Sequence, residues 1–235
     1  MNFDSVAFDL DGTLYPNYAL NLRLIPFVLK DWRFLRALGS AREIIRCGQP
    51  GEGGDFYTAQ AALMAGILGV DAGIIREKVD TQIYRGWELH FKKIRLFSGV
   101  LETLSAFRAA GLKLGLLSDF PPHNKLEYLG IASCWDAALC SEQVGRLKPD
   151  SLPFVELAGA LDSEPHRILF VGNSFRYDIA GAKKAGMKAA LIKRSILSTG
   201  ASAGGTGFGA KNKNNALQAD FVFSGYRQLC NYVLN

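Results

Sequence analysis

The sequence predicts an α/β protein with a doubly wound, mostly parallel sheet and an inserted α-helical domain. Three observations lead to this prediction. Short apolar runs rich in β-forming residues alternate with helical patterns, as in proteins that carry helices on both faces of a sheet. Several of these runs are apolar nearly throughout, as expected for strands that are covered on both faces. Residues 16–96, in contrast, show helical periodicity that no strand pattern interrupts.

Six strands are predicted along the chain. They are SVAFDL at 5–10, LKLGLLS at 112–118, WDAALC at 135–140, RILFVG at 167–172, KAALIK at 188–193 and ADFVF at 219–223. Helices are predicted over 99–111, 149–161 and 176–186, because two of these segments end on glycine and the other has a proline near its start. In a Rossmann-like sheet of this kind, ligands bind at the carboxyl ends of the strands.

Two domains are expected from this pattern. Residues 1–15 and 97–235 would form the Rossmann-like core, and residues 16–96 would form a helical cap domain inserted after the first strand. Residues 195–218 are rich in Gly, Ser, Ala and Asn and lack periodicity, which predicts a long surface loop.

The composition indicates an ordinary globular protein, with 49% hydrophobic and 21% charged residues. The net charge of +5 modestly favours an anionic substrate. No basic run or zinc-finger spacing indicates nucleic acid, and the most apolar stretch, 24–38, is too short and too charged to span a bilayer. We therefore expect no nucleic-acid or membrane partner. A cytoplasmic location with reduced cysteines is expected, because we find neither a secretory signal pattern nor paired cysteine spacing.

Two carboxylates end the first predicted strand. Asp9 and Asp11 are one residue apart, so in a strand they would point the same way and repel each other when both are ionised. A bound cation explains such a pair, and so do two different roles, one as nucleophile and one as proton donor. From this stretch alone, a solvent-exposed turn at Gly12 and Thr13 explains it equally well.

Polar residues in later segments favour a role for Asp9 and Asp11 in catalysis or cation binding over a solvent-exposed turn. Ser118 ends the second strand, Lys148 precedes a predicted helix, and Asn173 and Asp178 follow the fourth strand. If the strands are parallel, all these groups lie at the same edge of the sheet. A hydroxyl, a lysine and a cluster of oxygen ligands are what a phosphoryl group and a hard cation require around a carboxylate nucleophile.

In this order, DLDGTL, a serine that ends a strand, KPD and VGNSFRYD resemble the four motifs of the haloacid dehalogenase-like hydrolase superfamily. The resemblance covers residues 1–15 and about 97–235, and DLDGT is its most specific part. It implies a helical cap inserted after the first motif. Dehalogenases of this superfamily usually lack an acid at the second aspartate position, whereas phosphatases keep it. The resemblance with Asp11 present therefore implies the phosphatase branch.

The resemblance also implies roles for individual residues. Asp9 would be the nucleophile that becomes an aspartyl-phosphate, and Asp11 would protonate the leaving group and then activate the hydrolytic water. Ser118 and the backbone N–H that follows it would hold the phosphoryl oxygens, and Lys148 would neutralise charge. The implied phosphate-binding residues are Gly12, Ser118, Asp119 and Lys148.

Mg²⁺ is the cofactor that the resemblance implies. The Asp9 carboxylate, the Asp11 backbone carbonyl and Asn173 would bind it. Family members most often carry aspartate where this chain has Asn173, and the lost charge should weaken cation binding. Asp178 matches the second acidic position of the motif and would support the site through water or Lys148. A carboxylate favoured by the first turn of a helix is the alternative explanation for Asp178.

The sequence thus predicts a Mg²⁺-dependent phosphatase that hydrolyses a small phosphorylated metabolite through phospho-Asp9. A phosphomutase of the same fold is one alternative. A non-catalytic descendant that binds a phosphometabolite or a protein is another, although the joint presence of Asp9, Asp11, Ser118 and Lys148 argues against it. No motif specifies the substrate or the oligomeric state.

Overall fold

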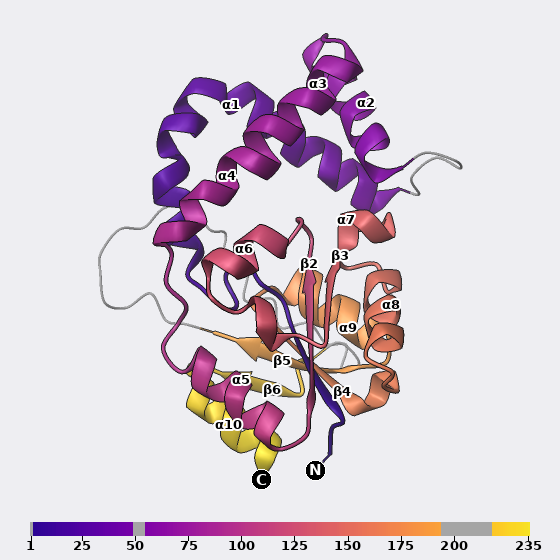
Figure 1. Cartoon of the computed structure of the whole chain (residues 1–235). Helices are drawn as coiled ribbons and strands as arrows, with labels where there is room; N and C mark the ends of the chain where they lie inside the picture. Colours follow the sequence, from indigo (N-terminus) through magenta and orange to yellow (C-terminus); the bar gives the residue numbers. More distant parts are fainter. Residues whose placement is uncertain (1, 49–54, 194–217) are drawn as a thin grey trace.

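A six-stranded parallel sheet is the centre of the computed structural model, which describes residues 2–48, 55–193 and 218–235 (Figure 1). The strands follow the order β3-β2-β1-β4-β5-β6, and every neighbouring pair is parallel. The predicted doubly wound α/β fold is confirmed, and all six predicted strands are present. They are β1 (Ser5–Phe8), β2 (Lys113–Ser118), β3 (Ala137–Cys140), β4 (Ile168–Gly172), β5 (Lys188–Ile192) and β6 (Phe221–Phe223).

The two faces of the sheet have separate apolar cores. Val6 and Phe8 of β1 pack into one core with α5 (Val100–Ala109) and α10 (Tyr226–Leu234). Ala7 points to the other face, where α8 (Leu152–Ala160) and α9 (Ala180–Lys184) cover the sheet. Because β1 lies between β2 and β4, the chain reverses its winding direction beside the carboxyl end of β1. Ligands bind at such a switch point in doubly wound sheets.

Several short elements complete this part of the chain. They are α6 (His123–Tyr128), α7 (Ser141–Val144), the 3₁₀ turns Ala132–Cys134 and Pro165–Arg167, and the π-helical turn Phe175–Ile179. The helix predicted over 176–186 is therefore present as a π-helical turn followed by α9.

A helical region follows β1 and lies over the carboxyl ends of the strands (Figure 1). It consists of α1 (Asn17–Cys47), α2 (Phe56–Leu68), α3 (Ala72–Lys78), the π-helix Val79–Arg85, α4 (Gly86–Glu88) and the 3₁₀ turn Leu89–Lys93. The side chain of Asp55 caps α2 by accepting a hydrogen bond from the Thr58 N–H, and α1 is kinked at Asp31. These helices share an apolar core formed by Phe34, Ala37, Leu38, Ala41, Ala61, Met64, Ile75, Val79 and Ile83.

Within the helical region, the segment from α3 to the 3₁₀ turn at Leu89–Lys93 changes its helix type along its length. In the π-helix, the Thr81 hydroxyl donates to the carbonyl of Glu77 at 2.8 Å. Such a bond competes with the regular backbone ladder. The π-helix carries Ile83 and Tyr84 to the wall of a pocket that is described below.

Two further predictions concern loops and membranes. The loop predicted over 195–218 lies outside the described residues, except for its last residue. In the described part of the chain, no single helix has the length and apolar character needed to cross a bilayer; one pair, Phe56–Leu68 with Ala72–Lys93, meets that criterion jointly but is bent by 112°.

Candidate active site

A buried lysine joins two carboxylates at the switch point of the sheet. The Lys148 Nζ donates to Asp9 Oδ1 at 2.6 Å and to Asp178 Oδ1 at 2.8 Å. It also donates to the backbone carbonyl of Leu117 at 3.3 Å. The other oxygen of Asp178 accepts the N–H groups of Asn173 and Ser174, so Asp178 links the loop after β4 to Lys148.

The electrostatics of this cluster follow from its burial. Burial raises the pKa of Asp9 to about 7, the charge of Asp178 acts in the same direction, and Lys148 opposes them. Burial alone would lower the pKa of Lys148, but the charges of Asp178 and Asp9 outweigh it and raise that pKa. One ammonium group therefore faces two buried carboxylates, and a further positive charge would be stabilised beside Asp9.

The loop after β1 brings a glycine against two asparagines. The Thr13 hydroxyl donates to Asp9 Oδ2 at 2.7 Å, which holds the second oxygen of that carboxylate. Gly12 has a φ of +86°, and a Cβ at this position would lie 2.1 Å from Asn173 Nδ2 and 2.4 Å from Asn17 Nδ2. Only glycine combines this backbone conformation with such close neighbours.

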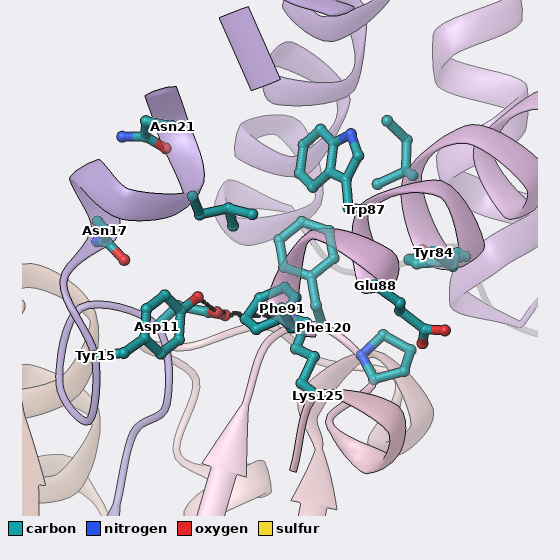
Figure 2. A pocket seen from close by; sticks show the side chains of 13 residues that line it. Asp11, Tyr15, Asn17, Asn21, Tyr84, Trp87, Glu88, Phe91, Phe120 and Lys125 are labelled. Atoms are coloured by element: carbon teal, nitrogen blue, oxygen red, sulfur yellow. Dashed lines mark hydrogen bonds and ion pairs between the residues drawn. The ribbon is translucent and has the colours of Figure 1, made fainter. Parts of the chain in front are cut away.

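The carboxylate of Asp11 has partners different from those of Asp9. The Tyr15 hydroxyl donates to Asp11 Oδ1, and Lys125 Nζ lies 3.4 Å from both carboxylate oxygens (Figure 2). The predicted strand through Leu10 ends at Phe8 in the structure, so the strand alternation that would align the two aspartates does not apply. Asp11 instead lines a pocket between the helical region and the sheet.

The loop after β2 contributes Ser118 and Asp119. The buried Ser118 Oγ accepts the N–H of Phe120 at 3.2 Å. Asp119 Oδ1 accepts the N–H of Lys148 at 3.2 Å, and Asp119 Oδ2 accepts from Arg46 Nη2 at 2.7 Å. Burial acts to raise the pKa of Asp119, but the charges of Lys148 and two arginines lower it overall. Asp119 is therefore an anion that fixes the Lys148 backbone.

Two arginines of α1 were not predicted as site residues. The buried Arg42 pairs with Glu142, and its guanidinium lies 4.0 Å from the ring centroid of Phe120. Arg46 donates to Asp119 and, through Nε, to the Lys148 carbonyl at 3.0 Å. These contacts join the helical region to the loops that follow β2 and β3. The i,i+4 spacing of Arg42 and Arg46, which places both on one helix face, is the sequence signal that could have indicated them.

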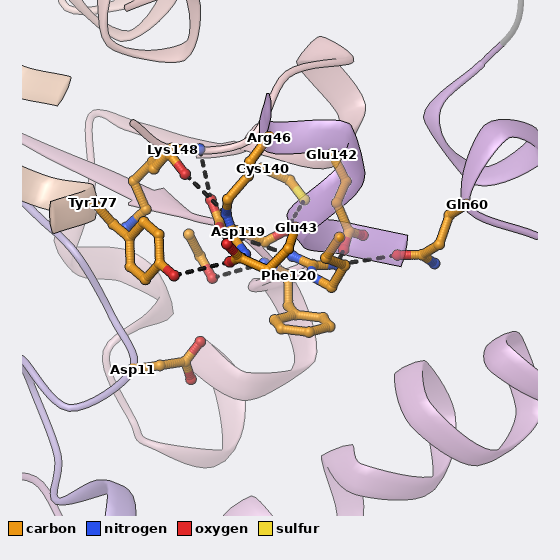
Figure 3. Close-up of polar contacts among 12 residues, drawn as sticks. Asp11, Glu43, Arg46, Gln60, Asp119, Phe120, Cys140, Glu142, Lys148 and Tyr177 are labelled. Carbon is orange, nitrogen blue, oxygen red and sulfur yellow. Dashed lines mark hydrogen bonds and ion pairs between the residues drawn. The ribbon is translucent and has the colours of Figure 1, made fainter. Parts of the chain in front are cut away.

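The remaining partners in the described residues extend this network. The Glu43 carboxylate accepts from the Tyr177 hydroxyl at 2.9 Å and from Arg176 at 2.7 Å. Among the described residues, Arg42 Nη2 and Glu142 Oε2 are buried without a hydrogen-bond partner. Of the predicted residues, Asp9, Asp178 and Asp119 contact Lys148. Asp11 instead contacts Tyr15 and Lys125, which were not predicted, and Figure 3 shows it apart from Lys148 and Asp119.

The donor set at Gly12 fits a hard cation. In the described chain, no three His, Cys, Asp or Glu residues converge as a metal cluster. The candidate ligands are oxygens of the Asp9 carboxylate, the Asp11 backbone carbonyl and the Asn173 amide, and the Asn173 amide group, through its Nδ2, lies next to Gly12. Oxygen donors of these types suit Mg²⁺, and the raised pKa of Asp9 indicates that positive charge would be favourable there.

Fold and site together define an α/β enzyme with its polar groups at the carboxyl edge of a parallel sheet. The chain belongs to the haloacid dehalogenase-like hydrolase family, whose model matches residues 3–186. The family predicted from the four motifs is therefore confirmed.

Named relatives support the phosphatase branch. The chain is 31% identical over 207 residues to a phosphoglycolate phosphatase of Salmonella paratyphi A, and the match covers 79% of each chain. It is 34% identical over 109 residues to a glyceraldehyde 3-phosphate phosphatase of Methanothermobacter thermautotrophicus, a match that covers 45% of this chain and 48% of that enzyme. The predicted class, a phosphoric monoester hydrolase, agrees with both relatives.

Solved structures are similar in fold. A HAD phosphatase from Thermococcus onnurineus has a TM-score of 0.62 at 20% identity, with 99% of this chain and 98% of that chain covered. An L-2-haloacid dehalogenase from Xanthobacter autotrophicus has a TM-score of 0.66 at 19% identity and 98% coverage of both chains. At such identities the likeness concerns the fold alone.

Proposed function

We propose that this chain is a Mg²⁺-dependent phosphatase that hydrolyses a small phosphorylated metabolite through an aspartyl-phosphate on Asp9. The observation that carries the proposal is the separation of two carboxylates at the switch point. Lys148 and Thr13 hold Asp9 at 2.6 and 2.7 Å, whereas Asp11 faces a pocket large enough for a leaving group. The named phosphatase relatives support the substrate class.

The groups around Asp9 would serve phosphoryl transfer. Asp9 attacks phosphorus, and the bond to the leaving-group oxygen breaks as the bond to Asp9 forms. Lys148 neutralises charge on Asp9 and on the phosphoryl oxygens, which the Ser118 hydroxyl and the Asp119 N–H also hold. Asp178 fixes the Lys148 ammonium at 2.8 Å and thereby keeps it in this position.

Asp11 would act as general acid and then as general base. It donates a proton to the departing oxygen and later takes one from the water that attacks phospho-Asp9. Tyr15 and Lys125 hold its carboxylate at the pocket wall. The helical region, residues 16–96, would act as a cap that supplies the other wall of the pocket and excludes water.

Mg²⁺ would be held by the Asp9 carboxylate, the Asp11 carbonyl and Asn173. When bound, it supplies positive charge beside the phosphoryl oxygens. A screen of phosphorylated metabolites with and without Mg²⁺ tests the proposed function directly. We expect hydrolysis that needs Mg²⁺ and that is lost with a chelator. Absence of turnover on all esters at every Mg²⁺ concentration would reject the function.

Asn173→Asp is expected to lower the Mg²⁺ concentration for half-maximal activity. An added carboxylate near a partly hydrated cation contributes about 1–2 kcal/mol when water screens the two charges almost as strongly as in bulk. Calorimetric Mg²⁺ titration should show the same increase in affinity, which separates metal binding from turnover.

A control variant, Asn21→Asp, adds the same charge at the wall of the pocket and should change Mg²⁺ affinity less. Unchanged affinity in Asn173→Asp would mean that Asn173 does not contact the metal. Wild-type inactivity that Asn173→Asp rescues would mean that the natural chain has lost the reaction.

Gly12→Ala is expected to reduce activity by at least about tenfold. The new Cβ would overlap the side chains of Asn173 and Asn17, which would have to move away from the Gly12 backbone. Gly130→Ala is the matched control, because Gly130 has a φ of +71° but no neighbour within 4 Å. Both variants should lose about 1–2 kcal/mol of unfolding free energy from the left-handed backbone. Equal activity of the two variants would contradict a role for the Gly12 neighbourhood.

A further inference from the structure

The pocket beside Asp11 has aromatic walls. It encloses about 210 Å³ between the helical region and the loop after β2. Tyr84, Trp87 and Phe91 come from the helical region, and Phe120 comes from the loop after β2 (Figure 2). Apolar cavities of about 150 Å³ bind benzene, so this volume accommodates one ring with a short linker.

The aromatic walls are held in place by their own contacts. The Phe120 ring centroid lies 6.3 Å from those of Tyr84 and Trp87, and the Arg42 guanidinium lies 4.0 Å from the Phe120 centroid. Phe91 is buried and meets Tyr15 edge to face at 5.3 Å. Preformed aromatic surfaces favour flat apolar groups over flexible polar ones.

The charges of the pocket do not favour an anionic leaving group. Of the described residues that line it, Lys125 is the cation, whereas Asp11 and Glu88 are acids. The Lys125 ammonium already faces both Asp11 oxygens at 3.4 Å. Glu88 accepts from the Asn124 amide at 2.6 Å and has no cationic partner among its described contacts. With Asp11 protonated as the general acid, the charges of Lys125 and Glu88 balance, so the pocket offers a carboxylate no surplus of positive charge.

A neighbouring hollow does not supply the missing cation. It lies beyond Tyr84 and Glu88, which line both spaces, and contains Arg76 and Arg85. Arg76 pairs with Asp55 at 3.6 Å, and Arg85 pairs with Asp80. Both arginines thus already face carboxylates.

We propose that the pocket takes an uncharged leaving group that contains a ring, so the substrates are phosphomonoesters of uncharged aromatic alcohols rather than phosphorylated hydroxy acids. The assignment of a leaving group rests on the proposed phosphatase function. An aromatic leaving group would give this chain a substrate class different from phosphoglycolate and glyceraldehyde 3-phosphate, for which its relatives are named.

Phosphonates test the pocket without turnover, because their P–C bond is not hydrolysed. Calorimetry with Mg²⁺ present would compare 2-phenylethylphosphonate, propylphosphonate and 3-phosphonopropionate on the full chain. We expect the phenyl compound to bind at least about tenfold more tightly than the propyl compound. The carboxylate compound should bind more weakly than the propyl compound. Equal affinities for phenyl and propyl, or tightest binding of 3-phosphonopropionate, would overturn the proposal.

Variants connect this preference to the pocket. Trp87→Leu should reduce the phenyl advantage to below about threefold. Trp32→Leu, which changes an exposed tryptophan of α1, should leave the advantage unchanged. Glu88→Gln should strengthen binding of 3-phosphonopropionate relative to propylphosphonate. A phenyl advantage that Trp87→Leu does not reduce would place the ring outside this pocket and overturn the assignment.

Hydrolysis separates this inference from the phosphatase proposal. Acetyl phosphate and benzyl phosphate would be assayed with the same protein. Turnover without a phenyl preference in the phosphonate series would keep the phosphatase and overturn the aromatic pocket. A phenyl preference without turnover of any ester would keep the pocket and overturn the phosphatase.

Discussion

Asp9→Asn is expected to lower kcat by at least about 10⁴-fold, a loss of about 5.5 kcal/mol of transition-state stabilisation. The amide that replaces the carboxylate cannot attack phosphorus, so no covalent intermediate forms. Wild-type protein mixed with substrate and quenched should carry an acyl phosphate on Asp9 that hydroxylamine cleaves. The variant should carry none. Mass spectrometry of the peptide that contains residue 9 provides this readout.

The fold should survive this substitution. An asparagine oxygen can accept from Lys148, and its amide can donate to the Thr13 hydroxyl, which rotates to accept. Lys148 also keeps its 2.8 Å contact with Asp178. Thermal unfolding would check that the variant is folded.

A control variant makes the same aspartate-to-asparagine change far from the candidate active site. Asp220 pairs with Lys183 at 2.9 Å and accepts the Ala189 N–H beside β5, so Asp220→Asn alters a carboxylate in another part of the sheet. We expect its kcat to stay near the wild-type value. Asp9→Asn activity within tenfold of wild type, a loss of only about 1.4 kcal/mol, would remove Asp9 from the nucleophile role.

The sheet could be predicted from the sequence because each strand is a local signal. Apolar runs mark all six strands, and their alternation with helical patterns predicts a mostly parallel sheet, although it does not specify the strand order that the structure shows. The helices α6 and α7 have only six and four residues, which is too short for a periodic pattern to stand out. In α10, the buried Tyr226, Leu229 and Val233 do follow a helical spacing that we did not use.

The site was only partly predictable. Asp9, Lys148 and Asp178 were predicted to meet because they follow strands of one sheet, and the structure joins them. Arg42 and Lys125 were not predicted, because they lie within the helices α1 and α6 rather than in a segment that follows a predicted strand. Such contacts depend on how these helices pack against the loops, and a helical spacing alone does not specify the partner.

The strand alternation assumed for Asp9 and Asp11 stops at Phe8 for a local reason. The backbone N–H groups of Thr13 and Leu14 both bond to the carbonyl of Leu10, so a turn begins immediately after the strand. The two carboxylates consequently meet different partners, Lys148 and Lys125. Two carboxylates in different environments can serve in different roles, one as nucleophile and the other as proton donor.

Asp11→Asn is expected to slow ester cleavage according to the leaving group. For an alkyl ester such as benzyl phosphate, loss of the general acid should lower the phosphorylation rate by about 10²–10⁴-fold. For acetyl phosphate or an activated aryl ester, the leaving group departs without a proton, so this rate should fall by less than about tenfold. Rapid-quench measurement of phospho-enzyme formation would separate the two classes.

Breakdown of the intermediate gives a second test of Asp11, because the same residue would activate the hydrolytic water. Asp11→Asn should therefore accumulate phospho-Asp9 with activated substrates and show a burst followed by slow turnover. Glu88→Gln is the matched control, because it removes a negative charge from the same pocket. Glu88 contacts Asn124 and not Asp11 in its described hydrogen bond. The Glu88→Gln variant should show neither the leaving-group dependence nor the burst. Equal losses of the phosphorylation rate for good and poor leaving groups in Asp11→Asn would contradict general-acid catalysis, and would leave Asp11 as a residue that positions the backbone carbonyl and the pocket wall.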